Sequence, residues 1–226
     1  MRRYALYYAP PEGALADFTA RWLGWDAAAG CARAHPELAG LALPVAELTA
    51  APRKYGFHGT LKAPFRLADG MGEPSLRSAC AWVARRLSPV SLPGLRLARL
   101  GGFLALVPEG DAAPLAALAA EVVTALDAFR APPDAAEIAR RNPEKLTEAQ
   151  RELMARWGYP YVLGEFRFHL TLTGNLPPET AAQVQAALEP QLAPLLPRPF
   201  EITDICLFGE AEDGNFRLLQ RYPLGG

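Results

Sequence analysis

Hydrophobic and polar residues alternate along several short segments of the chain. The clearest case is residues 55–67 (YGFHGTLKAPFRL). Side chains on a strand point alternately to opposite faces, so Phe57 and Leu61 are expected to pack into a core while His58 and Thr60 share the other face. The same reasoning predicts further strands at residues 3–9, 90–98, 102–107, 165–173, 200–208 and 216–222.

Apolar residues recur every three to four positions in other segments, the spacing of a helix with one buried face. This spacing predicts helices at residues 13–25, 75–87, 115–129, 134–141, 147–157 and 178–192. Residues 27–52 carry no clean period and are expected to form loops and short helical turns. Strands and helices do not alternate regularly and no Gly-rich phosphate loop is present, so the order predicts an α+β fold with mostly antiparallel pairing.

Composition is that of one ordinary globular unit. The chain has 226 residues, half of them hydrophobic, and a formal net charge of -1. Cys31, Cys80 and Cys206 are far apart and form no metal-ligand spacing, so neither a disulfide framework nor a zinc site is expected. A reducing cytoplasm is the expected compartment.

Two classes of ligand are not expected from these features. The apolar run at residues 4–9 is too short for a signal peptide, and no stretch approaches the roughly 18 apolar residues that a bilayer crossing needs, so no membrane is expected as a partner. A net charge near zero gives no positive field along the molecule, so a long nucleic-acid duplex is not expected either. A small anion in a local pocket remains compatible.

One pentapeptide pattern occurs twice. Phe57-His58-Gly59-Thr60-Leu61 matches Phe168-His169-Leu170-Thr171-Leu172, and these two segments contain two of the three histidines. On a strand each His shares a face with its Thr, while the Phe and Leu point to the core. Two such strands 111 residues apart (169 minus 58) indicate an internal duplication that presents two imidazoles and two hydroxyls to one cleft.

Paired imidazoles suit the hydrolysis of a phosphodiester. Attack on phosphorus needs a base that takes a proton from water and an acid that protonates the leaving oxygen, and histidine exists in both forms near neutral pH. Hydroxyl donors such as Thr60 and Thr171 would hold non-bridging oxygens. The chain shows no compact cluster of His and carboxylates, so no metal and no other cofactor is expected.

The tandem His-x-Thr segments FHGTL and FHLTL resemble the 2H phosphoesterase superfamily, which includes RNA 2',3'-cyclic phosphodiesterases. The longer strings KYGFHGTLKAPFRL, FRAPPDAAEIARR, RWGYPYV and EFRFHLTLTG are similar to a bacterial branch associated with phosphonate metabolism. The resemblance covers essentially the whole chain. It implies one domain over residues 1–226 with two lobes related by a pseudo-twofold axis, built from antiparallel sheets with outer helices around a central groove. His58, Thr60, His169 and Thr171 are then the catalytic residues.

Basic residues near the motifs are candidates for binding the substrate. Only 3 of the 23 basic residues are lysine, and two of them, Lys54 and Lys62, flank His58 on the same parity. Arg167 flanks His169 in the same way. The charged segment at about 130–161 offers further candidates, above all Arg130 and Arg141. Tyr55 has the core-facing parity and is expected to pack there.

The leading interpretation is a metal-independent phosphoesterase that hydrolyses a small cyclic phosphodiester, either a ribose cyclic phosphate or a cyclic nucleotide, in phosphonate metabolism. Two alternatives stay open: an RNA 2',3'-cyclic phosphodiesterase that processes RNA ends, and a non-catalytic module that binds a phosphorylated ligand. The expected partner is in each case a small phosphorylated molecule or an RNA end. The pattern does not predict an oligomeric state, nor which His is acid and which is base.

Overall fold

A seven-stranded antiparallel sheet runs through the computed structural model, which describes residues 1–225; the expected end of the domain at residue 226 lies outside the described residues. The sheet has the order β11-β10-β1-β4-β8-β7-β6. Its strands are β1 (Arg3–Tyr8), β4 (Gly59–Phe65), β6 (Leu95–Leu100), β7 (Phe103–Pro108), β8 (Leu170–Thr171), β10 (Asp204–Glu210) and β11 (Phe216–Pro223). Two short pairs lie outside it: β2 (Trp25–Asp26) with β3 (Cys31–Ala32), and β5 (Val90–Leu92) with β9 (Phe200–Ile202). The predicted α+β class with antiparallel pairing is confirmed.

Helices cover the two halves of this sheet. They are α1 (Ala14–Leu23), α2 (Val45–Leu48), α3 (Ala50–Arg53), α4 (Glu73–Ala84), α5 (Ala113–Ala125), α6 (Ala135–Ala139), α7 (Glu148–Trp157) and α8 (Pro178–Leu192), with short 3-10 turns at Asp127–Phe129, Pro143–Lys145, Leu163–Glu165 and Ala193–Leu195. Thr147 caps α7, because its hydroxyl accepts a hydrogen bond from the Gln150 amide at 3.2 Å. Over the described range, none of these helices has the length and apolar character that a membrane span requires.

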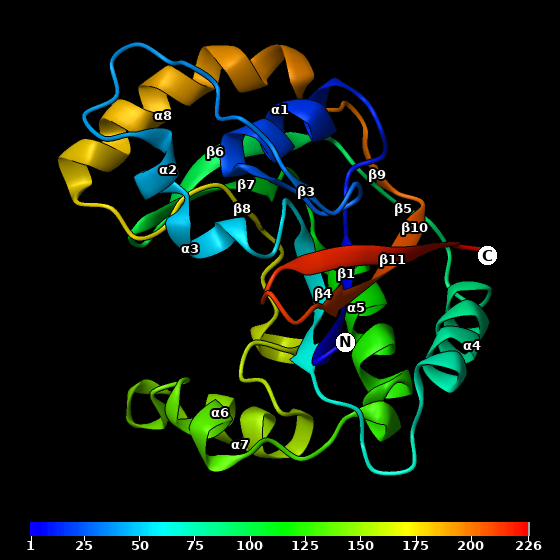
Figure 1. Cartoon of the computed structure of the whole chain (residues 1–226). Coiled ribbons are helices and arrows are strands. Elements are labelled where there is room, and N and C mark those ends of the chain that lie inside the picture. Colours follow the sequence, from blue (N-terminus) through cyan, green and yellow to red (C-terminus); the bar gives the residue numbers. More distant parts are fainter. Residues whose placement is uncertain (226) are drawn as a thin grey trace.

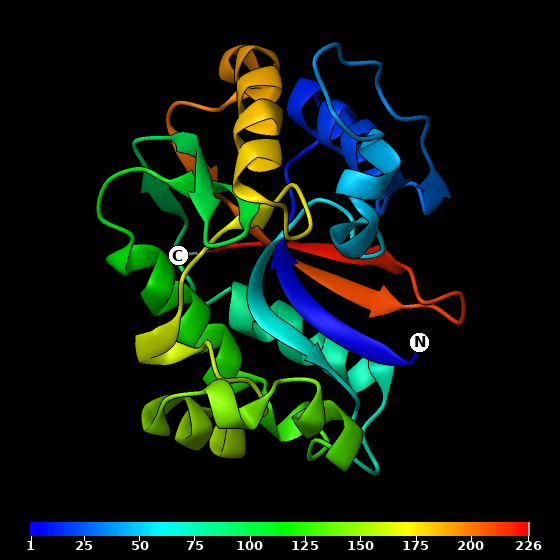
Figure 2. The ribbon, with the colours of Figure 1, turned by 90° about the vertical axis from the view of Figure 1, so that its left-hand side faces the viewer.

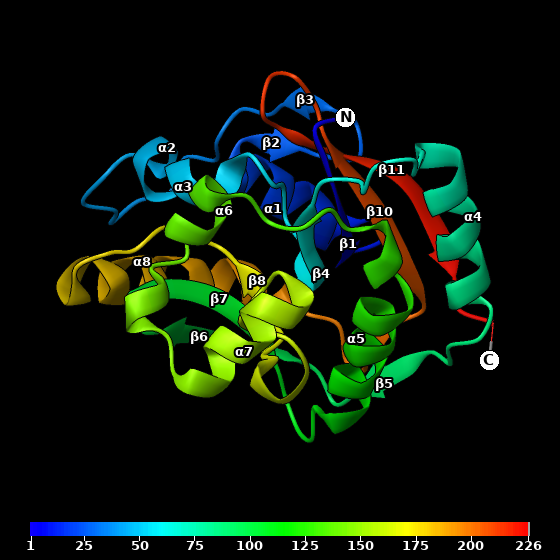
Figure 3. The same cartoon turned by 90° about the horizontal axis from the view of Figure 1, so that it is seen from below.

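The two halves of the sheet have different helical partners. Helix α8 packs on the β6/β7 hairpin, whereas α4 packs on β10 and β11 and α5 packs on β4. In Figure 1, α1 and α8 lie at one end of the molecule and α6 and α7 at the other. Figure 2 shows β1, β4, β10 and β11 together as one curved half of the sheet, and Figure 3 shows α6 and α7 from below, on the side where β4 and β8 meet.

The two halves are joined where the two motif strands meet. Strands β4 and β8 share one pairing, Gly59 opposite Leu170. The second strand is shorter than predicted, since β8 covers only Leu170 and Thr171 of the expected segment 165–173. Beyond β8, the amides of Leu172 and Thr173 still donate hydrogen bonds to the Leu104 carbonyl, at 2.9 and 3.3 Å, and these bonds hold the segment against β7.

Aromatic rings fill the core directly beneath this junction. Phe168 is buried and lies with its ring centroid 6.1 Å from Tyr8 and 6.0 Å from Phe200. A Cβ atom on Gly59 would stand only 2.2 Å from the Phe168 ring, so no larger residue fits at that position. The glycine of the first motif therefore lets the core phenylalanine of the second motif pack under it.

A β-bulge interrupts the alternation of β4 where this strand pairs with β1. Along its edge with β1, Tyr7 pairs with Thr60 but the next residue, Leu6, pairs with Lys62. From one pairing to the next β1 advances by one residue but β4 by two, so β4 contains one extra residue, a β-bulge. Because paired residues share a face, the bulge moves Lys62 to the face of Leu6, opposite to the face of Thr60.

Candidate active site

The two His-x-Thr segments place four side chains on one face of the sheet. In an antiparallel pair centred on Gly59 and Leu170, His58 lies opposite Thr171 and Thr60 lies opposite His169. Leu170 is fully buried on the other face, whereas all four motif side chains are half-buried. A local twofold relation between the strands therefore exchanges one motif for the other.

This arrangement leaves a space between the imidazoles. Residues directly opposite on an antiparallel pair have Cβ atoms about 5 Å apart, and diagonal neighbours such as His58 and His169 about 7–8 Å apart. Each imidazole thus has a hydroxyl from the other strand at its side. A tetrahedral phosphate between the two rings would face a nitrogen from each side and a hydroxyl from each strand.

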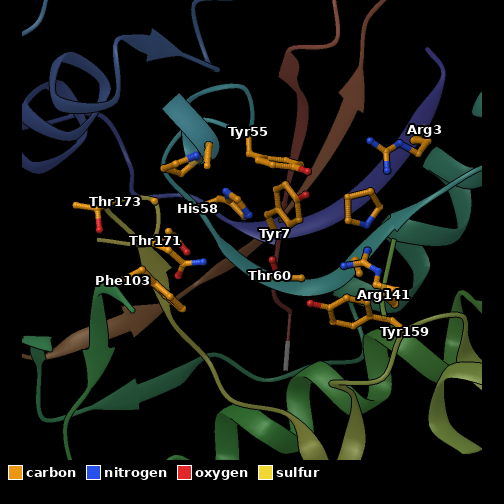
Figure 4. A pocket seen from close by; sticks show the side chains of 16 residues that line it. Arg3, Tyr7, Tyr55, His58, Thr60, Phe103, Arg141, Tyr159, Thr171 and Thr173 are labelled. Atoms are coloured by element: carbon orange, nitrogen blue, oxygen red, sulfur yellow. The ribbon is translucent and has the colours of Figure 1, made fainter. Parts of the chain in front are cut away.

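The motif face opens into a groove with a cavity of about 330 Å³ (Figure 4). His58, Thr60 and Thr171 line the cavity. His169 is not part of this lining; its ring centroid lies 5.6 Å from that of Phe103, which does line the cavity. The remaining lining residues are Arg3, Tyr7, Ala51, Pro52, Tyr55, Ala63, Pro64, Arg141, Tyr159, Thr173, Gly174 and Asn175.

Both imidazoles are held by backbone carbonyls two residues upstream. Nδ1 of His58 lies 2.9 Å from the Gly56 carbonyl oxygen, and Nδ1 of His169 lies 2.8 Å from the Arg167 carbonyl oxygen. A carbonyl only accepts hydrogen bonds, so Nδ1 carries the proton in each ring. The Nε2 atom of each histidine is therefore the one available for proton transfer.

The environment of His58 favours its neutral form. Burial lowers the pKa of His58 to about 4, against an ordinary value of 6.5; its hydrogen bond to Gly56 opposes this, and the nearby His169 adds to the lowering. The ring also stacks on Tyr7, with centroids 3.9 Å apart and planes inclined by 26°. At neutral pH His58 is thus an uncharged imidazole whose Nε2 carries no proton.

Tyrosines from three distant segments line the groove, and the sequence pattern did not identify them as site residues. Tyr7 comes from β1, Tyr55 follows α3 and Tyr159 follows α7. The expectation that Tyr55 packs away from the groove is wrong, because it lines the groove and its ring lies 5.9 Å from that of His58. Burial raises the pKa of Tyr7 and of Tyr159. Both phenols therefore stay protonated.

The structure corrects the expected position of Lys62. The bulge in β4 turns this side chain away from the groove; it is buried, and its ammonium donates to the Val123 carbonyl at 3.0 Å and to Asp127 at 3.2 Å. Burial lowers the pKa of Lys62 to about 8, and the attraction of Asp127 opposes that shift. Strict alternation, on which the prediction depended, does not hold across a bulge.

The other predicted basic residues are distributed over two places. Arg141 lines the groove, with its guanidinium 4.6 Å from the Tyr159 ring centroid. Lys54 and Arg130 line an adjoining cavity, where Arg130 already bonds Asp127 at 2.8 and 3.1 Å. The Arg167 side chain is exposed and lines neither cavity; only its carbonyl reaches the site, as the partner of His169.

Metal-ligating side chains do not gather in the described part of the chain. Within residues 1–225, no group of three or more His, Cys, Asp or Glu side chains is placed to hold a metal ion. The polar atoms that face the groove come from imidazole, hydroxyl, amide and guanidinium groups. Such a set binds a phosphate through hydrogen bonds and positive charge.

The two His-x-Thr segments meet at the centre of an antiparallel sheet, and His58, Thr60 and Thr171 line one groove, as the resemblance to the 2H phosphoesterases implies. The chain belongs to the family described as "Protein of unknown function (DUF1045)", whose model matches residues 60–217. That match covers more than two thirds of the chain and includes the second motif whole.

Curated relatives match more than three quarters of the chain. The chain is 38% identical over 178 residues to "Ribose 1,5-bisphosphate phosphokinase PhnN" of Janthinobacterium sp. (strain Marseille), covering 78% of this chain and 39% of the relative. It is 38% identical over 175 residues to the protein of the same name from Laribacter hongkongensis (strain HLHK9), covering 77% and 40%. The chain thus spans about two fifths of the length of these relatives.

Solved structures with a similar chain course have low sequence identity. LigT of E. coli is 13% identical with a TM-score of 0.45, covering all of this chain and 98% of that one. A protein described as a phosphoesterase is 14% identical with a TM-score of 0.42 over the whole of both chains. A protein of Thermus thermophilus, TT0787, is 15% identical with a TM-score of 0.45, covering 99% and 98%.

Proposed function

We propose that this protein is a metal-independent phosphoesterase that hydrolyses a small cyclic phosphodiester by acid and base catalysis from two histidines. The observation that carries the proposal is the register of β4 and β8, which sets His58, Thr60, His169 and Thr171 on one face of the sheet, where all of them but His169 line the groove. Each histidine presents Nε2 for proton transfer, and each threonine supplies a hydroxyl donor.

His58 is the base and His169 the acid in this proposal. The neutral Nε2 of His58 takes a proton from water as the water oxygen forms a bond to phosphorus. The bond from phosphorus to one ring ester oxygen breaks, and His169 donates its Nε2 proton to that oxygen. Thr60 and Thr171 donate hydrogen bonds to the non-bridging oxygens, whose negative charge grows in the transition state. The product is an acyclic phosphate monoester.

A ribose cyclic phosphate is the substrate that we favour, in phosphonate metabolism. The matched relatives carry a name that specifies a ribose bisphosphate, and the cavity of about 330 Å³ in the groove has room for a sugar. The kinase activity in that name is not proposed for this chain, because the chain contains no GxxxxGK[ST] phosphate-binding pattern.

The proposal is tested by the rate on a ribose cyclic phosphate of single His58→Ala and His169→Ala variants. Each should lower kcat/KM by about 100-fold or more, the usual effect of losing an acid or base. His35→Ala is the matched control: His35 contacts the Trp22 carbonyl through Nδ1 at 3.0 Å but lies outside the groove, so the rate should not change. Wild-type rates in both groove variants would overturn the mechanism, and binding without turnover would favour a phosphate-binding module.

A further inference from the structure

A second cavity continues from the groove. It has a volume of about 160 Å³, and four residues line both it and the groove. These are Arg3, Tyr55, Pro64 and Arg141. A water molecule takes about 30 Å³ in the liquid, so the second cavity has room for a phosphate-sized group. In Figure 4, Arg3 and Arg141 lie at the end of the groove away from Phe103, Thr171 and Thr173.

Six of the thirteen residues that line the second cavity are cations, and they come from separate parts of the fold. Lys54 follows α3, and Arg140 and Arg141 follow α6. Of the remaining three, one belongs to β1, one follows β4 and one follows the 3-10 turn after α5. Those three are Arg3, Arg66 and Arg130. Glu137 is the one acidic residue in the lining. In a protein of net charge -1, such a concentration of positive charge marks a site for an anion.

Half of these cations have no acidic partner. Arg3 pairs with Glu210 at 2.6 Å, Arg66 with Glu137 at 3.1 Å and Asp134 at 3.7 Å, and Arg130 with Asp127 at 2.8 Å. Lys54, Arg140 and Arg141 form no ion pair with any residue in the described range 1–225. Three cations of the lining are therefore available to an anionic ligand.

Aromatic rings orient two of the unpaired cations. The Lys54 ammonium lies 4.9 Å from the Tyr55 ring centroid, and the Arg141 guanidinium 4.6 Å from that of Tyr159. Cation–π contacts hold a charged group in place without neutralising it. Both tyrosines also line the groove, so the same rings border the space for the substrate and support the cations beyond it.

We infer that the second cavity binds a second phosphate group, a monoester carried by the same substrate whose cyclic phosphate lies between the two histidines. This inference rests on the proposed function and adds the substrate class: a sugar with one cyclic and one terminal phosphate. A phosphate monoester carries a charge between about -1.5 and -2 at neutral pH, which suits three unpaired cations better than the single charge of a nucleic-acid phosphodiester.

The first test measures binding and needs no turnover. Lys54 and Arg140 line the second cavity but not the groove, and both are exposed, so the double variant Lys54→Gln/Arg140→Gln is expected to fold. Calorimetric titration with ribose 5-phosphate should give saturable binding to wild type and binding at least tenfold weaker to the double variant. A tenfold loss of affinity corresponds to the loss of about one hydrogen bond to a charged group. Wild-type affinity in the double variant, or no preference of wild type for ribose 5-phosphate over ribose, would overturn the second site.

The second test compares turnover of ribose 1,2-cyclic phosphate with and without a 5-phosphate. Wild type should prefer the 5-phosphorylated substrate by at least tenfold in kcat/KM, and the double variant should lose that preference. Arg96→Gln, an exposed arginine on β6 that lines neither cavity, is the matched control and should keep it. An equal loss on both substrates would overturn the inference.

Two further outcomes separate the possible failures. The first is faster turnover of a short RNA ended by a 2',3'-cyclic phosphate than of the sugar substrates, with at least a tenfold slower rate in the double variant. That result would show that the second cavity binds a backbone phosphate of RNA instead of a monoester. If no substrate is turned over while ribose 5-phosphate binding still depends on Lys54 and Arg140, the second site stands and the proposed hydrolysis fails.

Discussion

Replacing His58 by Asn tests the inference that this imidazole is neutral at its place in the groove. The Asn amide can still donate to the Gly56 carbonyl, which His58 contacts at 2.9 Å, so the local backbone should be retained. Burial holds the pKa of His58 at about 4, below the ordinary 6.5 that we expect when the chain is unfolded. The unfolded chain therefore binds more protons at this residue between the two values, and stability is lost as the pH falls.

The expected magnitude follows from these two pKa values. Stability that depends on neutral His58 is fully present above about pH 6.5 and is lost as the pH falls through about 4. Between pH 7 and pH 4.5 this residue should lower the free energy of unfolding of wild type by about 2 kcal/mol. The carboxylates and the other histidines are common to wild type and His58→Asn, so their contribution cancels when the two pH-dependent losses are subtracted.

The assay is urea unfolding at pH 7 and pH 4.5, followed by circular dichroism, for wild type, His58→Asn and His35→Asn. His35 is the matched comparison because its Nδ1 also contacts a backbone carbonyl, that of Trp22 at 3.0 Å. The wild type should lose about 2 kcal/mol more than His58→Asn between the two pH values. Parallel losses in these two proteins would refute the argument that burial keeps His58 neutral.

Two further substitutions test how the strands position the site. Gly59→Ala puts a Cβ atom 2.2 Å from the Phe168 ring, so it should lower the free energy of unfolding by about 1–3 kcal/mol and slow turnover as the second motif moves. Gly164→Ala is the control, because a Cβ atom there would lie in open space. An unchanged Tm for Gly59→Ala would contradict the packing. Lys62→Met should change kcat/KM by less than about threefold, because Lys62 lines neither the groove nor the second cavity. A loss of more than tenfold in kcat/KM, with an unchanged free energy of unfolding, would indicate that Lys62 acts in the groove after all.

Repeated patterns made the centre of the site predictable. The alternation at residues 55–67 and its repetition at 168–172 predicted two strands that present His and Thr on one face, and the pairing of Gly59 with Leu170 agrees with that placement. Most helices were predictable for a similar reason: α8, for instance, covers residues 178–192 as expected from its apolar spacing. Period and repetition are local properties that one sequence contains.

Residues that reach the site through the chain's long-range course were not predictable. Tyr7 stacks on His58 only because β1 pairs with β4, and Tyr159 reaches the groove from the far end of α7. Lys62 was misplaced because a bulge leaves no mark in the alternation of residue types. Arg130 was expected to bind substrate from its charge, but its guanidinium pairs with Asp127 three residues earlier and also donates to the Arg156 carbonyl at 3.0 Å, a contact between distant parts of the chain.

The central claim is that the paired His-x-Thr strands open a cyclic phosphodiester without a metal. Phosphorus NMR in the presence of EDTA measures this directly, with ribose 1,2-cyclic phosphate, its 5-phosphate and nucleoside 2',3'-cyclic phosphates as substrates. The account predicts that a sugar cyclic phosphate signal converts to that of a monoester with wild type and persists with the His58→Ala/His169→Ala double variant. Conversion by the double variant, or conversion by wild type that EDTA abolishes, would contradict it.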